Sequence, residues 1–133
     1  MAIQTAAVID GPTPSFSGGT SHNLSVKGQS QNLLSCVVND GSEFINQSKI
    51  DFSVRDPRVL VTAPNGYTQA RSMVSIRIPL LLDNGKVTIN TLRLELSVDH
   101  EMTDSEIAKL LAYGSQILVV SDYNNFWYQQ LLS

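Results

Sequence analysis

Basic and hydroxyl side chains recur at every second position in the middle of this chain. In residues 49–55 every odd position is polar and every even position is apolar, and residues 73–78 and 92–98 nearly repeat the pattern. Alternate side chains of a β-strand share one face of the sheet, so these stretches predict strands with one buried and one wet face. Lys and Arg on a wet face can neutralise phosphates, and Ser or Thr hydroxyls can reach base edges and sugar oxygens of RNA.

Alternation also says which residues share this wet face. The set is Lys49, Asp51, Ser53, Arg55, Arg71, Met73, Ser75, Arg77, Thr91, Arg93, Glu95 and Ser97. It includes five of the nine basic residues of the chain. The alternative interpretation is a merely solvated sheet face, since any exposed sheet carries mixed Lys, Arg, Asp and Ser.

The charge of the chain is unevenly placed. The net charge is -3, but residues 49–97 hold seven basic and four acidic residues, whereas the rest holds two basic and eight acidic ones. A positive middle with negative flanks excludes a wholly basic nucleic-acid binder and favours one local positive surface.

The strands around this region are bounded by turn residues. We expect strands at residues 2–9, 22–27, 31–38, 49–55, 73–78 and 92–98. Gly28 is expected between the second and third strands, and turns are expected at 39–41, 64–66 and 83–85, where Asn or Asp is followed by Gly. Antiparallel pairing follows from such short connections.

After Val98 the pattern becomes helical. Thr103 and Glu106 fit a capping box, and Gly114 is placed to end the first helix. Asp122 is expected to cap a second short helix that carries Phe126 and Trp127. Strands followed by two helices predict an α+β fold with an antiparallel sheet.

The sequence indicates one domain, 1–133, and leaves its oligomeric state open. Two short helices cannot easily cover a wide sheet, so a two-fold dimer, in which each chain's helices also cover the partner's sheet, is one solution. A monomer whose helices pack only on their own sheet is the other.

Several classes of function are disfavoured. No catalytic motif, metal-ligand cluster, signal peptide or membrane-spanning run is evident, so we expect no enzyme, cofactor, metal or membrane partner. His100 beside Asp99 and Glu101 could be imagined as a general base, but is expected to cap the corner between strand and helix. Cys36, the single cysteine, is expected in the core of a protein that folds in a reducing cytoplasm.

Three strings together resemble the coat proteins of leviviruses, the small single-stranded RNA bacteriophages. They are 48–55 (SKIDFSVR), 74–79 (VSIRIP) and the pair LEL at 94–96 with TDSE at 103–106. The match covers roughly residues 48 to 114, and it depends on the joint order and spacing of these strings. It implies an N-terminal β-hairpin, a five-stranded antiparallel sheet and two C-terminal helices interlocked in a dimer.

The resemblance also implies a function. Dimers would assemble into a T=3 icosahedral shell in the bacterial host cytoplasm and become part of the virion. The inner sheet face would bind genomic RNA, including a hairpin whose binding represses replicase translation. Together with the alternation, the resemblance predicts these RNA-binding residues: Lys49, Ser53, Arg55, Arg71, Ser75, Arg77, Thr91 and Arg93.

The chain departs from the family pattern in three places. The turn at 83–85 is shorter than usual, the connection 56–70 is longer, and Thr91 stands where the family often has an aromatic residue that stacks on a base. These differences bear on shell geometry and on which RNA is bound. A cellular RNA-binding module that uses its sheet as a platform is the alternative, although such modules commonly alternate strands with helices and expose aromatic residues.

Overall fold

The computed structural model describes residues 22–41 and 46–132. The chain divides into two compact units: a sheet unit, Gly19–His100, and a helical unit that contains Glu101–Ser133. The strand expected at 2–9 lies outside the described residues. The prediction of a single domain stays a prediction.

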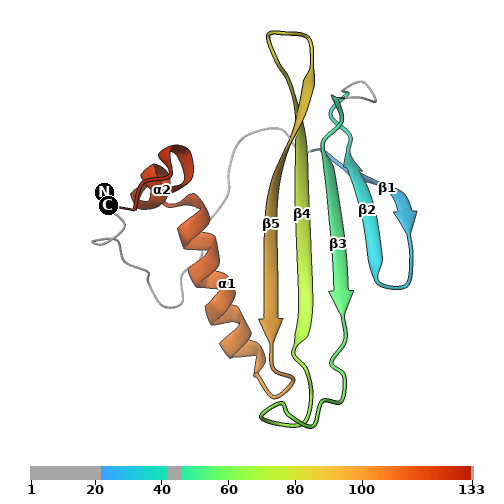
Figure 1. Cartoon of the computed structure of the whole chain (residues 1–133), viewed down its shortest axis with the longest axis vertical. Helices are drawn as coiled ribbons and strands as arrows, with labels where there is room; N and C mark the ends of the chain where they lie inside the picture. Colours follow the sequence, from blue (N-terminus) through green and yellow to red (C-terminus); the bar gives the residue numbers. More distant parts are fainter. Residues whose placement is uncertain (1–21, 42–45, 133) are drawn as a thin grey trace. The chain divides into compact units, whose positions relative to one another are not determined.

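The sheet unit is one antiparallel sheet of five strands in the order β1-β2-β3-β4-β5 (Figure 1). Its strands are β1 (Leu24–Gln29), β2 (Leu33–Val38), β3 (Lys49–Arg55), β4 (Ala70–Leu81) and β5 (Val87–Val98). Each strand pairs with its neighbour in the sequence. The predicted fold class, a five-stranded antiparallel sheet followed by two helices, is confirmed.

The turns explain why the strands pair with their neighbours. Gly66 and Gly85 both have a positive φ, 84° in each case, which costs glycine little. In the second of these turns the Leu82 N–H donates to the Lys86 carbonyl and the Gly85 N–H to the Leu82 carbonyl. The predictions at 64–66 and 83–85 are therefore confirmed, and Gly41 likewise has a φ of 83°.

The position expected for Gly28 is wrong. Gly28 lies inside β1 and pairs with Ser35, just after a register shift between Val26 and Gly28. The connection to β2 comes later, where the Ser30 N–H donates to the Leu33 carbonyl. A glycine inside a strand pattern can mark a bulge as well as a turn, and here it marks a bulge.

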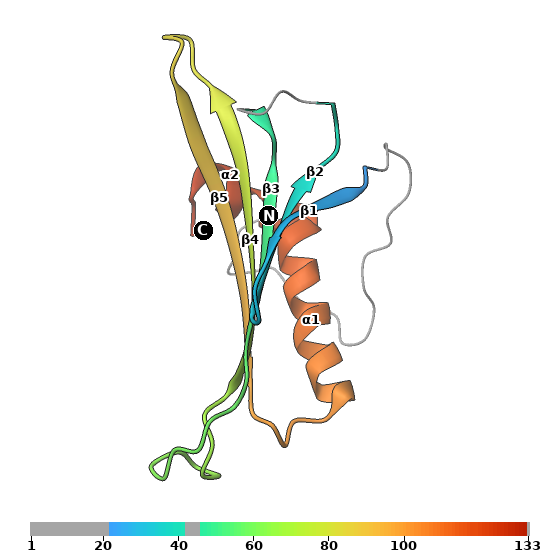
Figure 2. The same cartoon turned by 90° about the vertical axis from the view of Figure 1, so that its right-hand side faces the viewer.

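Strands β4 and β5 extend beyond the rest of the sheet. β3 pairs with β4 only from Lys49–Arg77 to Arg55–Arg71, whereas β4 and β5 pair along their full lengths. The outer part, residues 78–90, is therefore a two-stranded ribbon that projects past β3 (Figure 2). Its apolar side chains are exposed, including Leu81 at 62% and Ile89 at 58%.

The helical unit begins with a well-capped helix. In α1 (Asp104–Val119) the Thr103 hydroxyl accepts from the Glu106 N–H, while a Glu106 carboxylate oxygen accepts from the Thr103 N–H. The capping box is thus confirmed. A short 3-10 turn, η3 (Ser121–Tyr123), leads into α2 (Asn124–Gln129). Among the described helices, none has the length and apolar character needed to cross a membrane.

Two predictions for the helical unit are wrong. The first helix continues through Gly114 to Val119, and its C-cap residue, Val120, has an extended backbone. A glycine inside a helix lowers stability by roughly 0.5–1 kcal/mol relative to alanine. The apolar residues on both sides of Gly114 continue the helical pattern and can offset this loss. Asp122 lies within η3, and the cap of α2 is Tyr123, which makes no side-chain capping bond.

The end of the chain packs against α1 within the helical unit. The Trp127 indole N–H donates to the Ile117 carbonyl at 2.8 Å, and the Phe126 and Trp127 rings meet edge-on with centroids 4.9 Å apart. Ala112, Gln116 and Tyr123 are buried. These contacts hold the terminal helix, which would otherwise be expected to fray.

Candidate nucleic-acid interface

The register of the sheet aligns the predicted wet-face residues in rows across the strands. One row runs Lys49–Arg77–Thr91 and the next runs Asp51–Ser75–Arg93. The third row is Ser53–Met73–Glu95, and the fourth is Arg55–Arg71–Ser97. Because directly paired residues of antiparallel strands project to the same side, all twelve residues share one face, which we call the polar face.

All eight predicted RNA-binding residues lie on the polar face. Lys49, Arg55, Arg71, Thr91 and Arg93 are exposed, and Ser53, Ser75 and Arg77 are half-buried. The structure therefore places on one face the residues that alternation predicted to share it. The apolar even positions, such as Ile50, Phe52 and Val54, share the opposite side, which we call the apolar face.

Five basic and two acidic residues give the polar face a net charge of +3 in a chain whose total is -3. Two of the basic side chains form ion pairs with the two acidic ones. The Arg71 Nε lies 3.7 Å from a Glu95 carboxylate oxygen, and an Arg77 Nη2 donates to Asp51. Arg71 and Glu95 are each about half exposed, so water and salt screen this pair strongly. The positive surplus on this face could attract a polyanion.

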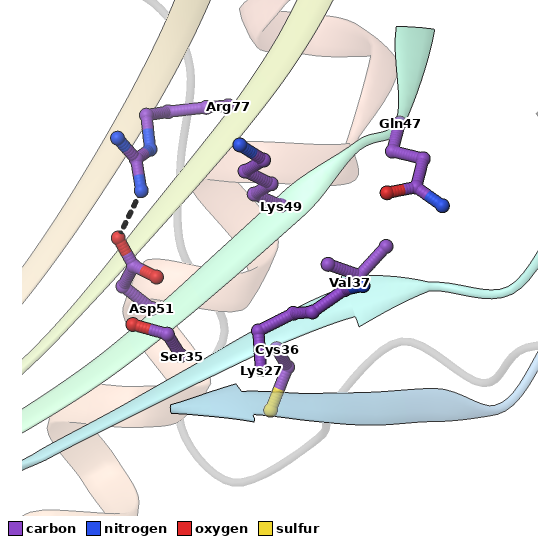
Figure 3. Close-up of a pocket in the computed structure, with 8 residues that line it drawn as sticks. All are labelled: Lys27, Ser35, Cys36, Val37, Gln47, Lys49, Asp51 and Arg77. Atoms are coloured by element: carbon purple, nitrogen blue, oxygen red, sulfur yellow. Dashed lines mark hydrogen bonds and ion pairs between the residues drawn. The ribbon is translucent and has the colours of Figure 1, made fainter. Parts of the chain in front are cut away.

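A hollow of about 260 Å³ opens at one side of the polar face, over β1 to β4 (Figure 3). We call it the β1–β4 hollow. It is lined by Lys27, Ser35, Cys36, Val37, Gln47, Lys49, Asp51 and Arg77. Three buried polar atoms around it have no hydrogen-bond partner among the described residues: Gln47 Oε1, Asp51 Oδ1 and Arg77 Nε.

Sequence reasoning missed the part of this hollow that comes from β1, β2 and the segment before β3. Lys27 stands at the register shift between Val26 and Gly28, so simple alternation could not assign it to a face. Ser35 pairs directly with Asp51, and Gln47 precedes β3 by two residues. The signal that could have found Ser35 is the register of β2 against β3, which the sequence alone does not give.

A second hollow lies over the other end of the polar face. It has a volume of about 360 Å³ and is lined by Ser53, Val54, Arg55, Arg71, Met73 and Glu95. Five of these residues come from the last two rows of the polar face, and they include positive and negative side chains. This hollow places Ser53, Arg55 and Arg71, three of the predicted RNA-binding residues, around a single depression.

The long connection 56–70 is tied to the end of β5 by a polar cluster. The Asn65 amide donates to both carboxylate oxygens of Asp99, at 2.6 and 2.5 Å, and lies 3.3 Å from His100 Nδ1. The Tyr67 and His100 rings meet edge-on at 4.9 Å. His100 thus contacts Asn65 and Tyr67 at the corner after β5. The described residues contain no group of His, Cys, Asp and Glu able to hold a metal.

Solved structures resemble this chain along its whole length. A chain from the virus-like particle of bacteriophage GQ-907 is 25% identical and superposes with a TM-score of 0.87, covering 99% of this chain and 100% of that one. A chain from the particle of bacteriophage AVE019 is 12% identical, with a TM-score of 0.68 and coverage of 97% and 98%. One from the particle of Wenzhou levi-like virus 4 is 15% identical, with a TM-score of 0.64 and coverage of 93% and 85%.

No protein-family model and no curated protein matches the sequence. The two more distant structures show the fold alone, and one of them is from a levi-like virus by name. The resemblance to levivirus coat proteins is confirmed by these comparisons. The neighbours are subunits of virus-like particles, which are structural proteins and not enzymes.

Proposed function

We propose that this chain is the coat protein of a small single-stranded RNA bacteriophage. In this proposal its copies dimerise, close into an icosahedral shell, as in T=3 particles, and bind genomic RNA on the polar face. The shell is assembled in the cytoplasm of the bacterial host and becomes the capsid of the virion. Binding of an RNA hairpin that represses replicase translation belongs to the same proposal.

The observation that carries the shell is the match with the GQ-907 particle. It covers 99% of this chain and 100% of the other, with a TM-score of 0.87. A subunit that matches along its full length offers the same kind of surfaces for assembly. The comparison supports assembly of this chain into a closed particle.

The polar face supports the RNA part of the proposal. Its Lys and Arg side chains lie in rows across β3, β4 and β5, with Ser and Thr hydroxyls between them. Cations spaced along a surface neutralise successive phosphates, and hydroxyls add contacts to sugars and bases. A cellular RNA-binding module remains the alternative, although the described polar face holds no aromatic residue to stack on a base.

Electron microscopy of the protein expressed alone in bacteria tests the shell. We expect uniform spherical particles in negative stain, with an absorbance ratio at 260 and 280 nm that shows nucleic acid in the same fraction. A small soluble species without particles, across a range of salt and with added RNA, would favour the binding-module alternative.

A double substitution tests the RNA face. Arg55→Ala with Arg93→Ala removes two cations from the polar face, so we expect particles with less RNA. In solution, the slope of log affinity against log salt should flatten by about 1.4, at about 0.7 for each lost contact with single-stranded RNA. Arg58→Ala with Lys86→Ala is the matched control, since both residues lie in connections outside the strands. Unchanged RNA content and salt slope in the test variant would refute the assignment.

A further inference from the structure

The long connection between β3 and β4 folds into a small hairpin, residues 58–68, which we call the lobe. It lies at the end of the sheet where β5 finishes (Figure 1). Val59 and Tyr67 form an isolated β-bridge within it. Beyond this bridge the Leu60 N–H donates to the Gly66 carbonyl. An isolated two-stranded hairpin is marginally stable in water at best. The lobe therefore depends on the contacts that attach it to the rest of the sheet unit.

Two side chains of the lobe attach it to the end of β5. The Asn65 amide nitrogen donates to both carboxylate oxygens of Asp99 and lies 3.3 Å from His100 Nδ1. The Tyr67 ring meets the His100 ring edge-on, with centroids 4.9 Å apart. The titratable neighbours of His100 are Asp99, the Tyr67 ring and, next in the chain, Glu101. His100 thus contacts both side chains that attach the lobe.

The orientation of Asn65 shows that His100 is neutral in this arrangement. The Asn65 amide oxygen accepts from the Tyr67 N–H at 3.2 Å. Its amide nitrogen therefore faces Asp99 and His100, whereas the opposite orientation would place an amide oxygen against two carboxylate oxygens. An amide nitrogen only donates hydrogen bonds. The His100 Nδ1 that it faces is therefore the unprotonated, accepting nitrogen of a neutral ring.

Protonation of His100 reverses this contact. Both ring nitrogens of a charged histidine carry a proton, so Nδ1 would present a donor to the Asn65 donor. Asp99 Oδ1, an acceptor, lies 3.8 Å from the same Nδ1, and the His100 side chain is 40% exposed, which leaves it room to turn. A turn of the ring toward Asp99 would form a charge-assisted hydrogen bond. The same turn would withdraw the ring from Asn65 and from its edge-on contact with Tyr67.

We propose that His100 is an acid-sensitive latch that holds the lobe at neutral pH and releases it in acid. The neutral ring and Asp99 together hold Asn65, so the lobe is closed onto the end of β5. The protonated ring takes Asp99 as its own partner, Asn65 loses acceptors, and the lobe opens. Val59 and Val61 of the lobe are 75% and 91% exposed, so opening moves an apolar surface that neighbouring molecules can contact. The latch does not depend on the proposed function.

Hydrogen exchange of the purified full chain, followed by mass spectrometry, tests the latch. The two conditions are about pH 8 and about pH 5, the ends of the range in which histidine ordinarily changes charge. Exchange times are scaled to the chemical exchange rate at each pH, so that the remaining difference measures opening of the structure. We expect the amides of the lobe to exchange about tenfold faster in acid, as for the loss of one hydrogen bond to a charged group.

The turn between β4 and β5 is the matched control within the chain. It has the same Asn–Gly sequence, and the Asn84 amide oxygen likewise accepts from the N–H two residues further on, at Lys86. No histidine lies within this turn, so its scaled exchange should be the same at both pH values. His22→Gln, which removes the other histidine of the chain, should leave the response of the lobe unchanged.

Two variants distinguish the latch from a general effect of acid. His100→Gln keeps a side chain that can accept from Asn65 but cannot gain a charge, so its lobe should exchange slowly at both pH values. Asn65→Ala removes the group that the latch holds, so its lobe should exchange fast at both.

Three results would overturn the latch. The first is an acid response that persists in His100→Gln, and the second is one that persists in Asn65→Ala. The third is equal protection of the lobe at both pH values in the natural sequence. Because the two variants act on different partners of the contact, failure of one to fold leaves the other as a complete test.

Discussion

Asn65 illustrates how one side chain can hold a long connection in place. Its amide nitrogen donates to Asp99 and its amide oxygen accepts from the Tyr67 N–H at 3.2 Å. The first bond joins residues 34 positions apart, while the second only shapes the local turn. The contact with Asp99 therefore links the tip of the connection 56–70 to the end of β5.

We predict that Asn65→Ala destabilises the sheet unit by about 1–2 kcal/mol, because hydrogen bonds to a charged group contribute about 1.5–3 kcal/mol and this one is only partly buried. Chemical denaturation of the full chain measures the change. Asn84→Ala is the matched control, since Asn84 makes the same local turn bond to the Lys86 N–H without a bond to a distant carboxylate. Equal losses in the two variants would show that the Asp99 contact contributes little.

At the residue scale, the sequence predicted the polar face well and the hollow poorly. Residues such as Lys49, Arg55 and Arg93 could be assigned to one face because a strand has a fixed period of two. Lys27 could not, because a bulge interrupts that period, and Gln47 could not, because it lies outside a strand. The ion pair of Asp51 with Arg77 needed the register of β3 against β4, which alternation does not determine.

At the scale of elements, α1 depends on its first turn. The Thr103 hydroxyl and N–H both donate to the Glu106 carboxylate, and these bonds hold the pKa of Glu106 below its ordinary value of 4.5. Hydrogen bonds that stabilise the ionised form of a carboxyl group lower its pKa in the folded state. The capping interaction is therefore linked to pH.

We predict that α1 loses stability in acid. The pKa of Glu106 is lower in the folded state than its value of about 4.5 in the unfolded state. Ionised Glu106 therefore stabilises the fold fully above about pH 4.5, and this stabilisation is lost as the pH falls through the pKa of the folded state. Glu106→Gln keeps a capping box but cannot titrate, so its acid dependence should be flatter in circular dichroism melts at a series of pH values. Thr103→Ala should cost about 1 kcal/mol and raise the pKa of Glu106 toward 4.5, as read by NMR. Identical acid profiles for the natural sequence and Glu106→Gln would show that the acid sensitivity does not come from Glu106.

The elements that the sequence predicted well are those with a local cause. Alternation predicted β3 at its observed bounds, and Thr103 with Glu106 predicted the start of α1. The end of α1 was wrong because Gly114 is compatible with both a helix interior and a helix end, and apolar residues beyond it continue the helix. β4 and β5 run further than predicted, since β4 continues through the adjacent apolar residues Leu80 and Leu81, and in β5 the alternation of Val87 and Ile89 is out of phase with that of 92–98.

At the scale of the whole molecule, the apolar face of the sheet is the strongest argument for a partner. In the single chain Phe52 is 37% exposed, Val54 is 51% exposed and Leu92 is 37% exposed. Strands that alternate this clearly are expected to bury one face. Large exposed apolar surfaces on soluble proteins mark sites of association, and the proposed shell of dimers would provide such burial.

The proposed dimer predicts that the two faces of the sheet respond oppositely to the same new charge. Phe52→Lys places an ammonium group on the apolar face, where an interface would have to desolvate it, so we expect neither particles nor stable dimers. Met73→Lys introduces the same charge at a side chain of equal exposure, 38%, but on the polar face, where assembly and RNA content should persist. Size-exclusion chromatography with light scattering distinguishes monomer, dimer and particle in both variants. Particles of normal size from Phe52→Lys would show that assembly does not bury the apolar face around Phe52, and would refute this prediction.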